Sequence, residues 1–361
     1  MPEIALDGIT KRFGRTRAVD DLTLTLADGE FFVLLGPTGA GKTTTLRLIA
    51  GLDLPDAGAI SIGGEDATGW SVAQRDVALV FQYYSLYPRY TVRQNLAFPL
   101  QSKVRHFSPD EIERRVARAA KMLRIEHLLE RKTDKLSGGE MQRVSIGRAI
   151  VRDPTVFLMD EPLSNLDAKL REVLRSELKD LQGTLGATFL FVTHDQIEAM
   201  SMGDRIGVLN EGRLVQVGAP NAIYDAPRDT FVATFVGSPA MNLLPVRIEG
   251  ERLLADGFAL PLTAEGRARL AGGDGPLTLG VRSEDVRVGP AGAASARVHH
   301  VENHGVEQVV TLRTGETLFK ATVPAVTRLA IEDTVAFDLN QARLHGFDTA
   351  TGDNRAIGGA R

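Results

Sequence analysis

The sequence predicts an α/β fold with a parallel sheet over its first two-thirds, followed by a smaller all-β domain. Near-continuous apolar runs of strand length, which suit parallel strands buried on both faces, alternate with amphipathic helical patterns. These runs are FFVLL at 31–35, VALVF at 77–81, VFLM at 156–159 and TFLFV at 188–192. After about residue 236 the pattern changes to short alternating segments separated by turns rich in Gly and Pro, which is typical of a small barrel or sandwich.

The helical stretches carry capping patterns of their own. Ser108 is the expected N-cap of a helix over 108–131, and Glu111 is expected to complete a capping box with it. Leucines recur at helical spacing over 166–181, which predicts a second long helix. Residues 350–361 have the composition of a loose tail.

The bulk composition excludes several classes of protein. The chain has no cysteine, so disulfides, thiol chemistry and cysteine-ligated zinc are excluded. A formal net charge of −4 argues against nucleic acid as the main partner. The first residues lack the pattern of a signal peptide, and no apolar stretch approaches the ~20 residues needed to span a bilayer. We expect a cytoplasmic protein that reaches a membrane only through a partner.

The segment GPTGAGKT at 36–43 follows the first apolar run and opens a helical run, as the phosphate-loop pattern G-x-x-x-x-G-K-[ST] requires. A chance glycine-rich turn is the alternative, and this context disfavours it. Lys42 would face the β- and γ-phosphates, and the Thr43 hydroxyl would be a ligand of Mg²⁺. The predicted ATP-binding residues of this loop are Gly36, Pro37, Thr38, Gly39, Ala40, Gly41, Lys42, Thr43 and Thr44.

Two acids end the apolar run at 156–159. The carboxyl ends of parallel strands meet at one edge of a sheet, so Asp160 and Glu161 should lie beside the phosphate loop. We expect Asp160 to hold Mg²⁺ through water and Glu161 to orient or deprotonate the attacking water. The alternative is a solvated acidic turn at the end of a strand.

A second anion site is predicted at LSGGE, 136–140, which we call the signature segment. Ser137, Gly138 and Gly139 present hydroxyl and N–H donors at the start of a helical run, without a cation of their own. Such a site is useful if another chain supplies the rest of the pocket. The carboxylate of Glu140 is expected to face away from phosphate and to cap its own helix.

The ordered set of motifs resembles the ATP-binding subunits of ABC transporters. The set comprises the phosphate loop, Gln82 in FQYYSLYP, the signature segment, the acidic strand end, SNLD at 164–167, and His194 in FVTHDQIEAM. The resemblance implies a P-loop NTPase (ABC ATPase) domain over 1–235 with an inserted helical subdomain at about 86–152. It implies an all-β, OB-like regulatory domain over 236–361.

In that family two ATPase subunits pair head to tail, and each signature segment contacts the ATP held by the other chain. The resemblance therefore implies a role in the partner's site for Ser137, Gly138, Gly139 and Glu140, although the family usually has Gln at the last of these positions. It implies that Gln82 senses the γ-phosphate and metal, that His194 contacts the γ-phosphate and holds Glu161, and that Asp167 communicates between the two sites. Phe13 is implied to stack on adenine.

Three details resemble the branch of maltose and glycerol-phosphate importers: EPLSNLDAKLR at 161–171, THDQIEAM at 193–200, and GSPAMNLLPV at 237–246 before GVRSEDV. The branch implies an ATPase peripheral to the cytoplasmic face of the inner membrane, acting as a homodimer or with a paralogous ATPase. Its partners would be two transmembrane permease subunits and, indirectly, an extracytoplasmic solute-binding protein, with no nucleic acid. A carbohydrate or polyol is the favoured solute; a polyamine or metal-ion importer, or a soluble ABC ATPase without a permease, are the alternatives.

Overall fold

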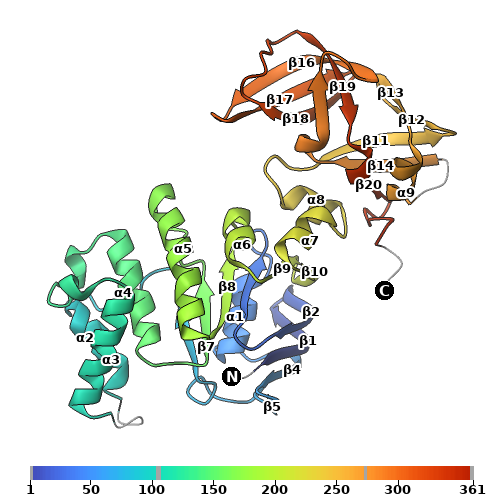
Figure 1. Cartoon of the computed structure of the whole chain (residues 1–361). Helices are drawn as coiled ribbons and strands as arrows, with labels where there is room; N and C mark the ends of the chain where they lie inside the picture. Colours follow the sequence, from blue (N-terminus) through green and yellow to red (C-terminus); the bar gives the residue numbers. More distant parts are fainter. Residues whose placement is uncertain (1–2, 103–106, 272–274, 358–361) are drawn as a thin grey trace. The chain divides into compact units, whose positions relative to one another are not determined.

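The computed structural model describes residues 3–102, 107–271 and 275–357. The chain forms two compact units, Met1–Pro220 and Asn221–Arg361, which are described separately (Figure 1). The first unit is α/β and the second is mainly β, so the predicted fold class is confirmed. The unit boundary lies before the domain boundary predicted at 235/236, which stays a prediction. Within the described ranges, no helix combines the length and apolarity needed to cross a membrane.

The first unit is built on a six-stranded sheet with the order β10-β9-β3-β8-β7-β6. All neighbouring pairs are parallel except the edge strand β10, which runs antiparallel to β9. Each of the four predicted apolar runs forms one of its strands. The strands are β3 (Phe31–Leu35), β6 (Val77–Val80), β7 (Val156–Asp160), β8 (Thr188–Thr193), β9 (Arg205–Asn210) and β10 (Arg213–Gly218).

The two faces of this sheet bury different apolar sets. Phe32, Leu34 and Val192 belong to a core shared with α1 (Lys42–Ala50) and with a second, antiparallel sheet. The opposite face carries stacked phenylalanine rings, and α5 (Ala168–Leu185) and α6 (Gln196–Met202) lie on that side. Burial on both faces explains why these strands are apolar almost without interruption.

The second sheet of this unit was not predicted, and its order is β2-β1-β4-β5. Its strands alternate buried and exposed positions, so each one alone is a weaker pattern than a fully apolar run. The strands are β1 (Ile4–Phe13), β2 (Thr16–Leu26), β4 (Ala57–Ile62) and β5 (Glu65–Asp66).

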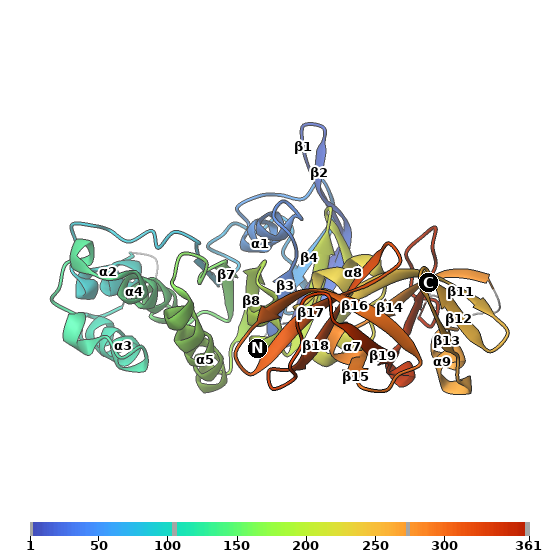
Figure 2. The ribbon, with the colours of Figure 1, turned by 90° about the horizontal axis from the view of Figure 1, so that it is seen from above.

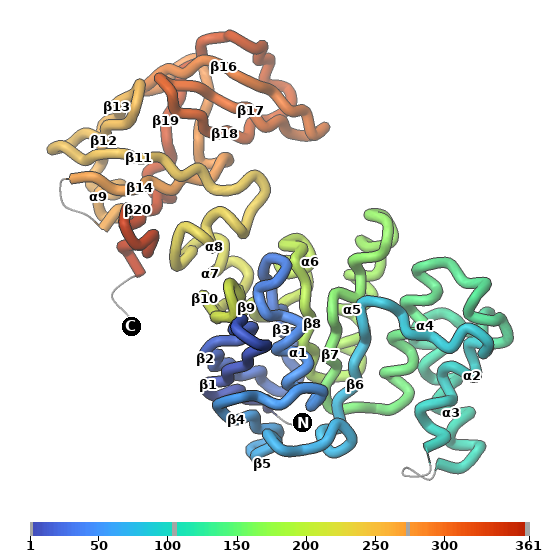
Figure 3. The backbone as a smooth tube through the Cα atoms, turned by 180° about the vertical axis from the view of Figure 1, so that it is seen from behind, coloured from blue at the N-terminus to red at the C-terminus, as the bar shows by residue number. Residues whose placement is uncertain are grey.

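A group of helices lies between β6 and β7 in the chain, as Figures 1 and 3 show. It contains α2 (Val92–Ala97), η1 (Phe98–Leu100), α3 (Pro109–Met122), η2 (Glu126–Leu128), η3 (Thr133–Lys135) and α4 (Gly138–Ile150). The helix predicted over 108–131 is therefore too long. It ends at Met122, and Arg124 at φ +57° lies in the left-handed region that cannot continue a helix.

The predicted capping box of α3 is only half present. The Ser108 hydroxyl accepts a hydrogen bond from the N–H of Glu111 at 3.2 Å. The Glu111 carboxylate, however, accepts from Arg114 and Arg115 in the next turn. Arginines three and four residues further along the helix compete with the N-cap N–H for this carboxylate.

The second unit packs two five-stranded sheets around one apolar core (Figures 1 and 2). Their orders are β13-β12-β11-β14-β20 and β15-β19-β16-β17-β18, and Phe258, Phe319 and Phe337 meet between them with ring centroids 5.1–6.2 Å apart. The elements are β11 (Asn242–Glu249), β12 (Arg252–Ala255), β13 (Phe258–Pro261), α9 (Ala264–Arg269), β14 (Gly275–Val281), η4 (Ser283–Asp285), β15 (Val286–Gly289), β16 (Ala294–Asn303), β17 (Glu307–Thr314), β18 (Thr317–Pro324), β19 (Thr334–Leu339), η5 (Gln341–Arg343) and β20 (His345–Phe347).

Arg282 connects the two short helices α7 (Pro220–Asp225) and α8 (Thr230–Phe235) to this β-rich part. The guanidinium of Arg282, which is 1% exposed, donates to the carbonyls of Tyr224, Ala233 and Val236 at 2.6–3.0 Å. It also stacks on the Tyr224 ring at 4.0 Å. Because a buried guanidinium without acceptors is costly, these contacts make α7 and α8 part of the second unit.

The predicted loose tail is ordered over part of its length. Asn354 is 2% exposed, and it donates hydrogen bonds to the carbonyls of Pro227 and Arg228 at 2.8 Å. The correction has a simple cause, because a polar side chain can be buried in an irregular segment when backbone acceptors meet it. Residues 358–361 lie outside the described part of the chain.

The Arg282 contacts generate a prediction about truncation. A chain ending at Pro220 should keep the ATP affinity of the full chain within about threefold, because the phosphate loop and both strand-end acids precede it. A chain ending at Val236 should have the same affinity but lower solubility, because α7 and α8 would expose the apolar side chains that they bury in the second unit.

Calorimetric titration with ATP and the soluble yield of both truncated chains provide the measurements. A loss of affinity beyond about tenfold in both chains would mean that residues after 236 help to build the nucleotide site.

Candidate nucleotide site

The phosphate loop connects the end of β3 to the start of α1, and two of its glycines are required by close approach. A Cβ on Gly36 would lie 2.3 Å from the carbonyl oxygen of Leu209. A Cβ on Gly41, the N-cap of α1 at φ +103°, would lie 2.2 Å from the carbonyl oxygen of Ala18. Any larger residue would push the loop away from its neighbours, so the loop's path depends on both glycines.

Lys42 is the first residue of α1 and is 5% exposed. Its Nζ donates to the carbonyls of Gly36 at 2.9 Å and Pro37 at 3.0 Å, and lies 3.6 Å from Oε1 of Glu161. Burial lowers the pKa of Lys42, and the Glu161 carboxylate opposes that shift. The ammonium group therefore lies across the phosphate loop and within reach of the acid after β7.

Asp160 ends β7 directly opposite the start of α1. Its Oδ1 accepts a hydrogen bond from the Thr43 hydroxyl at 2.9 Å. Burial raises the pKa of Asp160, and the Thr43 hydrogen bond opposes that shift. A hydroxyl and a carboxylate oxygen held together in this way are the hard oxygen donors that Mg²⁺ prefers, so the donor set fits that ion.

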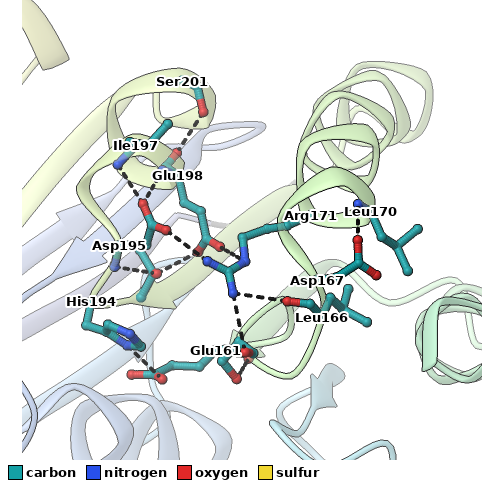
Figure 4. Close-up of polar contacts among 12 residues, drawn as sticks. Glu161, Leu166, Asp167, Leu170, Arg171, His194, Asp195, Ile197, Glu198 and Ser201 are labelled. Atoms are coloured by element: carbon teal, nitrogen blue, oxygen red, sulfur yellow. Dashed lines mark hydrogen bonds and ion pairs between the residues drawn. The ribbon is translucent and has the colours of Figure 1, made fainter. Parts of the chain in front are cut away.

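Glu161 has one carboxylate oxygen directed to each of two groups. Oε1 lies 3.6 Å from Lys42, and Oε2 lies 3.0 Å from Nδ1 of His194, which follows β8 (Figure 4). Its backbone is left-handed at φ +45°, while its N–H donates to the carbonyl of Val192 at 3.0 Å. A non-glycine residue in this region costs on the order of 1 kcal/mol, and such strain is concentrated at functional sites.

Lys42, Glu161 and His194 border a cleft of about 690 Å³, within the range of small-molecule sites, and Asp160 reaches it through its hydrogen bond with Thr43. Its lining includes predicted residues from the phosphate loop and from three further segments: Thr38, Gly39, Gly41, Lys42, Thr43, Thr44, Gln82, Glu161 and His194. Sequence analysis missed four further lining residues, Thr16, Arg17, Ala18 and Glu211. A signal was present, because Gly14 lies between two alternating runs and predicts a hairpin that returns through Thr16.

Phe13, the predicted adenine contact, is not among the described residues that line this cleft. It ends β1, its side chain is 51% exposed, and the ammonium group of Lys11 lies 5.5 Å from its ring. An exposed ring beside the hairpin is available to a ligand, but its role stays a prediction.

The signature segment is also absent from the described lining of the cleft. It begins α4 with a complete capping box: the Glu140 carboxylate accepts from the N–H of Ser137 at 2.7 Å, and the Ser137 hydroxyl accepts from the N–H of Glu140 at 3.4 Å. The predicted cap is confirmed, and the hydrogen bond from Ser137 lowers the pKa of Glu140. A Cβ on Gly139 would lie 2.5 Å from the Leu170 side chain, which explains why glycine occupies this position.

Gln82 connects two segments beside the cleft, whereas Asp167 caps its own helix. The carbonyl of Gln82, two residues after β6, accepts from Asn165 at 2.9 Å, and its side-chain amide donates to the Ser164 hydroxyl at 3.3 Å. Asp167 caps α5 by accepting from the N–H of Leu170 at 3.0 Å. The segment after β7 is thus held by Gln82 in its middle and by the cap of α5 at its end.

Comparisons with known proteins agree with this geometry. The ABC transporter family model matches residues 19–164, the MalK OB fold domain model matches 237–286, and the TOBE domain model matches 279–347. The xylose/arabinose import ATP-binding protein XacK of Haloferax volcanii is 46% identical over 98% of this chain and 95% of its own length. The trehalose/maltose import ATP-binding protein MalK of Thermococcus litoralis and the sn-glycerol-3-phosphate import ATP-binding protein UgpC of Ruegeria pomeroyi are each 46% identical, over 98% of this chain and 99% of their own length.

Solved structures show the same likeness over part of the chain. The ATP-binding cassette MJ0796, solved as a dimer in a post-hydrolysis state with ADP and Pi, is 31% identical with a TM-score of 0.54, covering 60% of this chain and 98% of that one. CbiO1 from Clostridium perfringens is 27% identical with a TM-score of 0.57, covering 61% and 89%.

A phosphate loop after one parallel strand, with acids after another parallel strand of the same sheet, defines a nucleotide-binding protein of the P-loop class. Within that class the full-length relatives place the chain more narrowly. The chain belongs to the ABC transporter family, as one of the ATP-binding subunits that hydrolyse ATP to power transport.

The geometry of Glu161 generates a prediction. Glu161→Gln should keep ATP affinity but lower the rate of hydrolysis by at least ~100-fold, because the amide cannot accept a proton from water. The ATP-bound variant should accumulate as a dimer with Mg-ATP, because the nucleotide is retained at the interface.

Phosphate release and light scattering provide the measurements. Glu172→Gln, an exposed position on α5, is the charge-matched control and should behave as the wild type. Hydrolysis near the wild-type rate with only monomer in solution would remove Glu161 from the chemistry.

Proposed function

We propose that this chain is the ATPase of an importer that carries a carbohydrate or polyol through a separate membrane permease. The observation that carries the proposal is the convergence of Lys42, the Thr43–Asp160 pair and the Glu161–His194 pair on one cleft. The solute class comes from the relatives, which are named as import proteins for xylose/arabinose, trehalose/maltose and sn-glycerol 3-phosphate. These names favour a carbohydrate or polyol over a polyamine or metal ion.

Each group has a role in the proposed hydrolysis. The loop N–H groups and Lys42 bind the β- and γ-phosphates, since both lie at the N-terminus of α1. Glu161 orients the attacking water and accepts its proton, and His194 holds the Glu161 carboxylate in place and faces the γ-phosphate. Mg²⁺, held through Thr43, Asp160 and Gln82, would neutralise phosphate charge.

The signature segment supports a head-to-tail dimer in which each ATP is enclosed by two chains. The donors at the start of α4 form an anion site, while the cleft of the same chain is lined by other segments. The MJ0796 cassette, whose structure is a dimer bound to ADP and Pi, supports this proposal because it combines pairing and bound nucleotide in one protein of this fold. The pair would consist of two copies of this chain, or of this chain and a paralogue, with Asp167 communicating between the sites.

The proposed assembly lies at the cytoplasmic face of the inner membrane. Two permease subunits would cross the membrane, a solute-binding protein would deliver the solute outside, and nucleic acid would have no part. Exposed aromatic side chains after β6, including Tyr83 and Tyr87, supply a surface for the permease. The second unit, matched by the MalK OB fold and TOBE models, would regulate the ATPase.

A mixed dimer tests the shared site. One chain carries Lys42→Ala, the other carries Ser137→Arg, and both carry Glu161→Gln to prevent turnover. If each site uses the loop of one chain and the signature segment of the other, one site is intact and the dimer binds one ATP with the affinity of the Glu161→Gln parent. If each chain uses its own signature segment, both sites are damaged.

Different affinity tags allow the mixed dimer to be purified, and bound ATP is counted per dimer. Each variant alone is the control, and it should bind less ATP per chain than the Glu161→Gln parent. A mixed dimer that binds no more ATP than these controls contradicts the shared site.

Copurification tests the coupling to a membrane. The full chain carrying Glu161→Gln, tagged and loaded with Mg-ATP, should retain two multi-spanning permease subunits from detergent-solubilised membranes of the source cell. The same purification with Lys42→Ala should retain less, because dimer formation requires ATP. Recovery of the ATPase dimer without any multi-spanning protein would favour the soluble ABC ATPase.

A further inference from the structure

Arg171, in the first turn of α5, lies between the two segments that carry Glu161 and His194 (Figure 4). We infer that Arg171 is a positioning residue for ATP hydrolysis, which holds the segment after β7 against the segment after β8 and so sets the distance between Glu161 and His194. The inference rests on the proposed function, because it assigns Arg171 a part in the same reaction.

The first set of contacts reaches the segment after β7. The Nη2 of Arg171 donates to the carbonyls of Leu166 at 3.1 Å and Ser164 at 3.5 Å. The Ser164 hydroxyl in turn donates to the carbonyl of Glu161 at 2.9 Å and accepts from Gln82 at 3.3 Å. Arg171 therefore fixes the chain three residues after Glu161, in a segment that also contacts Gln82.

The second set reaches the segment after β8. Arg171 Nη1 lies 3.4 Å from Oδ2 of Asp195, the residue that follows His194. The other oxygen, Oδ1, accepts from the N–H groups of Ile197 and Glu198 at the start of α6. The cap fixes the orientation of the Asp195 carboxylate, so an ion pair with Arg171 restrains the backbone beside His194.

A buried carboxylate explains why the cation remains in place. Glu198 is 3% exposed, its Oε1 lies 3.8 Å from Arg171 Nε, and its Oε2 accepts from the Thr193 hydroxyl at 2.6 Å. A buried charge without a partner is costly, so Arg171 is retained between Glu198 and Asp195. The planar guanidinium of Arg171 can donate to carbonyls and pair with carboxylates at the same time. The single ammonium group of a lysine is less able to make both kinds of contact.

The consequence concerns the rate of hydrolysis rather than nucleotide binding. The contact between Glu161 Oε2 and His194 Nδ1 joins two segments that Arg171 holds together. Misplacement of a catalytic group by about 1 Å can cost about 100-fold in rate. The phosphate loop has its own contacts, through Lys42 and Gly41, and these do not include Arg171 in the described structure.

Steady-state kinetics of the full chain test the inference with three variants of α5. Arg171→Gln should lower kcat for ATP by about tenfold to a hundredfold, with KM within about threefold of the wild type. Arg171→Lys should recover part of kcat, because it keeps the charge but not the fork. Arg175→Gln is the matched control, because it removes a charge that also acts on Glu198 from the next turn of α5, and kcat should stay within about twofold.

Asp195→Asn tests the ion pair itself. Asparagine still caps α6, so this variant removes the charge facing Arg171 with little effect on the helix. It should lower kcat in the same direction, and Arg171→Gln combined with Asp195→Asn should be no slower than Arg171→Gln alone, because the two groups act as one unit.

Three results would overturn the inference: wild-type kcat in Arg171→Gln, an equal loss in Arg175→Gln, or a fall in ATP affinity that accounts for the lost activity. If Arg171→Gln does not fold, wild-type kcat in both Arg171→Lys and Asp195→Asn is the overturning result. Failure of the proposed function is a separate outcome, because Glu161→Gln would then hydrolyse ATP as fast as the wild type.

Discussion

The parallel register of β3, β8 and β7 is the constraint on which the candidate site depends. Leu35 pairs with Thr193, and Val192 pairs with Asp160, so the three strands end at nearly the same level. The next residue in each chain segment then begins the phosphate loop, supplies the imidazole and supplies the second acid. A slip of one residue would turn the side chains of a strand to the other face and would separate these groups.

The two acids at the end of β7, Asp160 and Glu161, have different electrostatic surroundings. Asp160 is held by a neutral hydroxyl, and burial raises its pKa, so a cation nearby would favour its charged form. Glu161 already has a cation on one side and an imidazole on the other. Adjacent carboxylates therefore have different surroundings, which is what a metal ligand and a proton acceptor require.

Much of the first unit could be predicted because its signals are local. Strands buried on both faces are continuous apolar runs, and a phosphate loop must contain its glycines, lysine and threonine in one short segment. The antiparallel sheet of β1, β2 and β4 was missed, because half-buried strands give weaker patterns. Arg17 and Glu211 were missed as cleft residues, because only the paired strands bring them to the loop.

The predictions for the two ends of α3 and for the C-terminal segment failed because local sequence does not determine these contacts. Nothing in the sequence near Glu111 decides between the N-cap N–H and two arginines as partners. The end of α3 at Met122 comes with a left-handed Arg124, a conformation that this residue type does not signal. The ordered part of the tail depends on Asn354, whose acceptors, the carbonyls of Pro227 and Arg228, lie more than a hundred residues earlier in the sequence. Contacts over such separations are set by the tertiary fold and leave no local pattern.

The three carbonyls bound by Arg282 have a consequence for how such proteins can recombine. A gene fusion that joins the ATPase of one family member to the C-terminal domain of another at 236 would separate α7 and α8 from the arginine that binds their carbonyls. A fusion point at 220 carries the helices and their arginine as one inherited module. An exchange of C-terminal domains therefore keeps these three hydrogen bonds only if the break lies ahead of Tyr224.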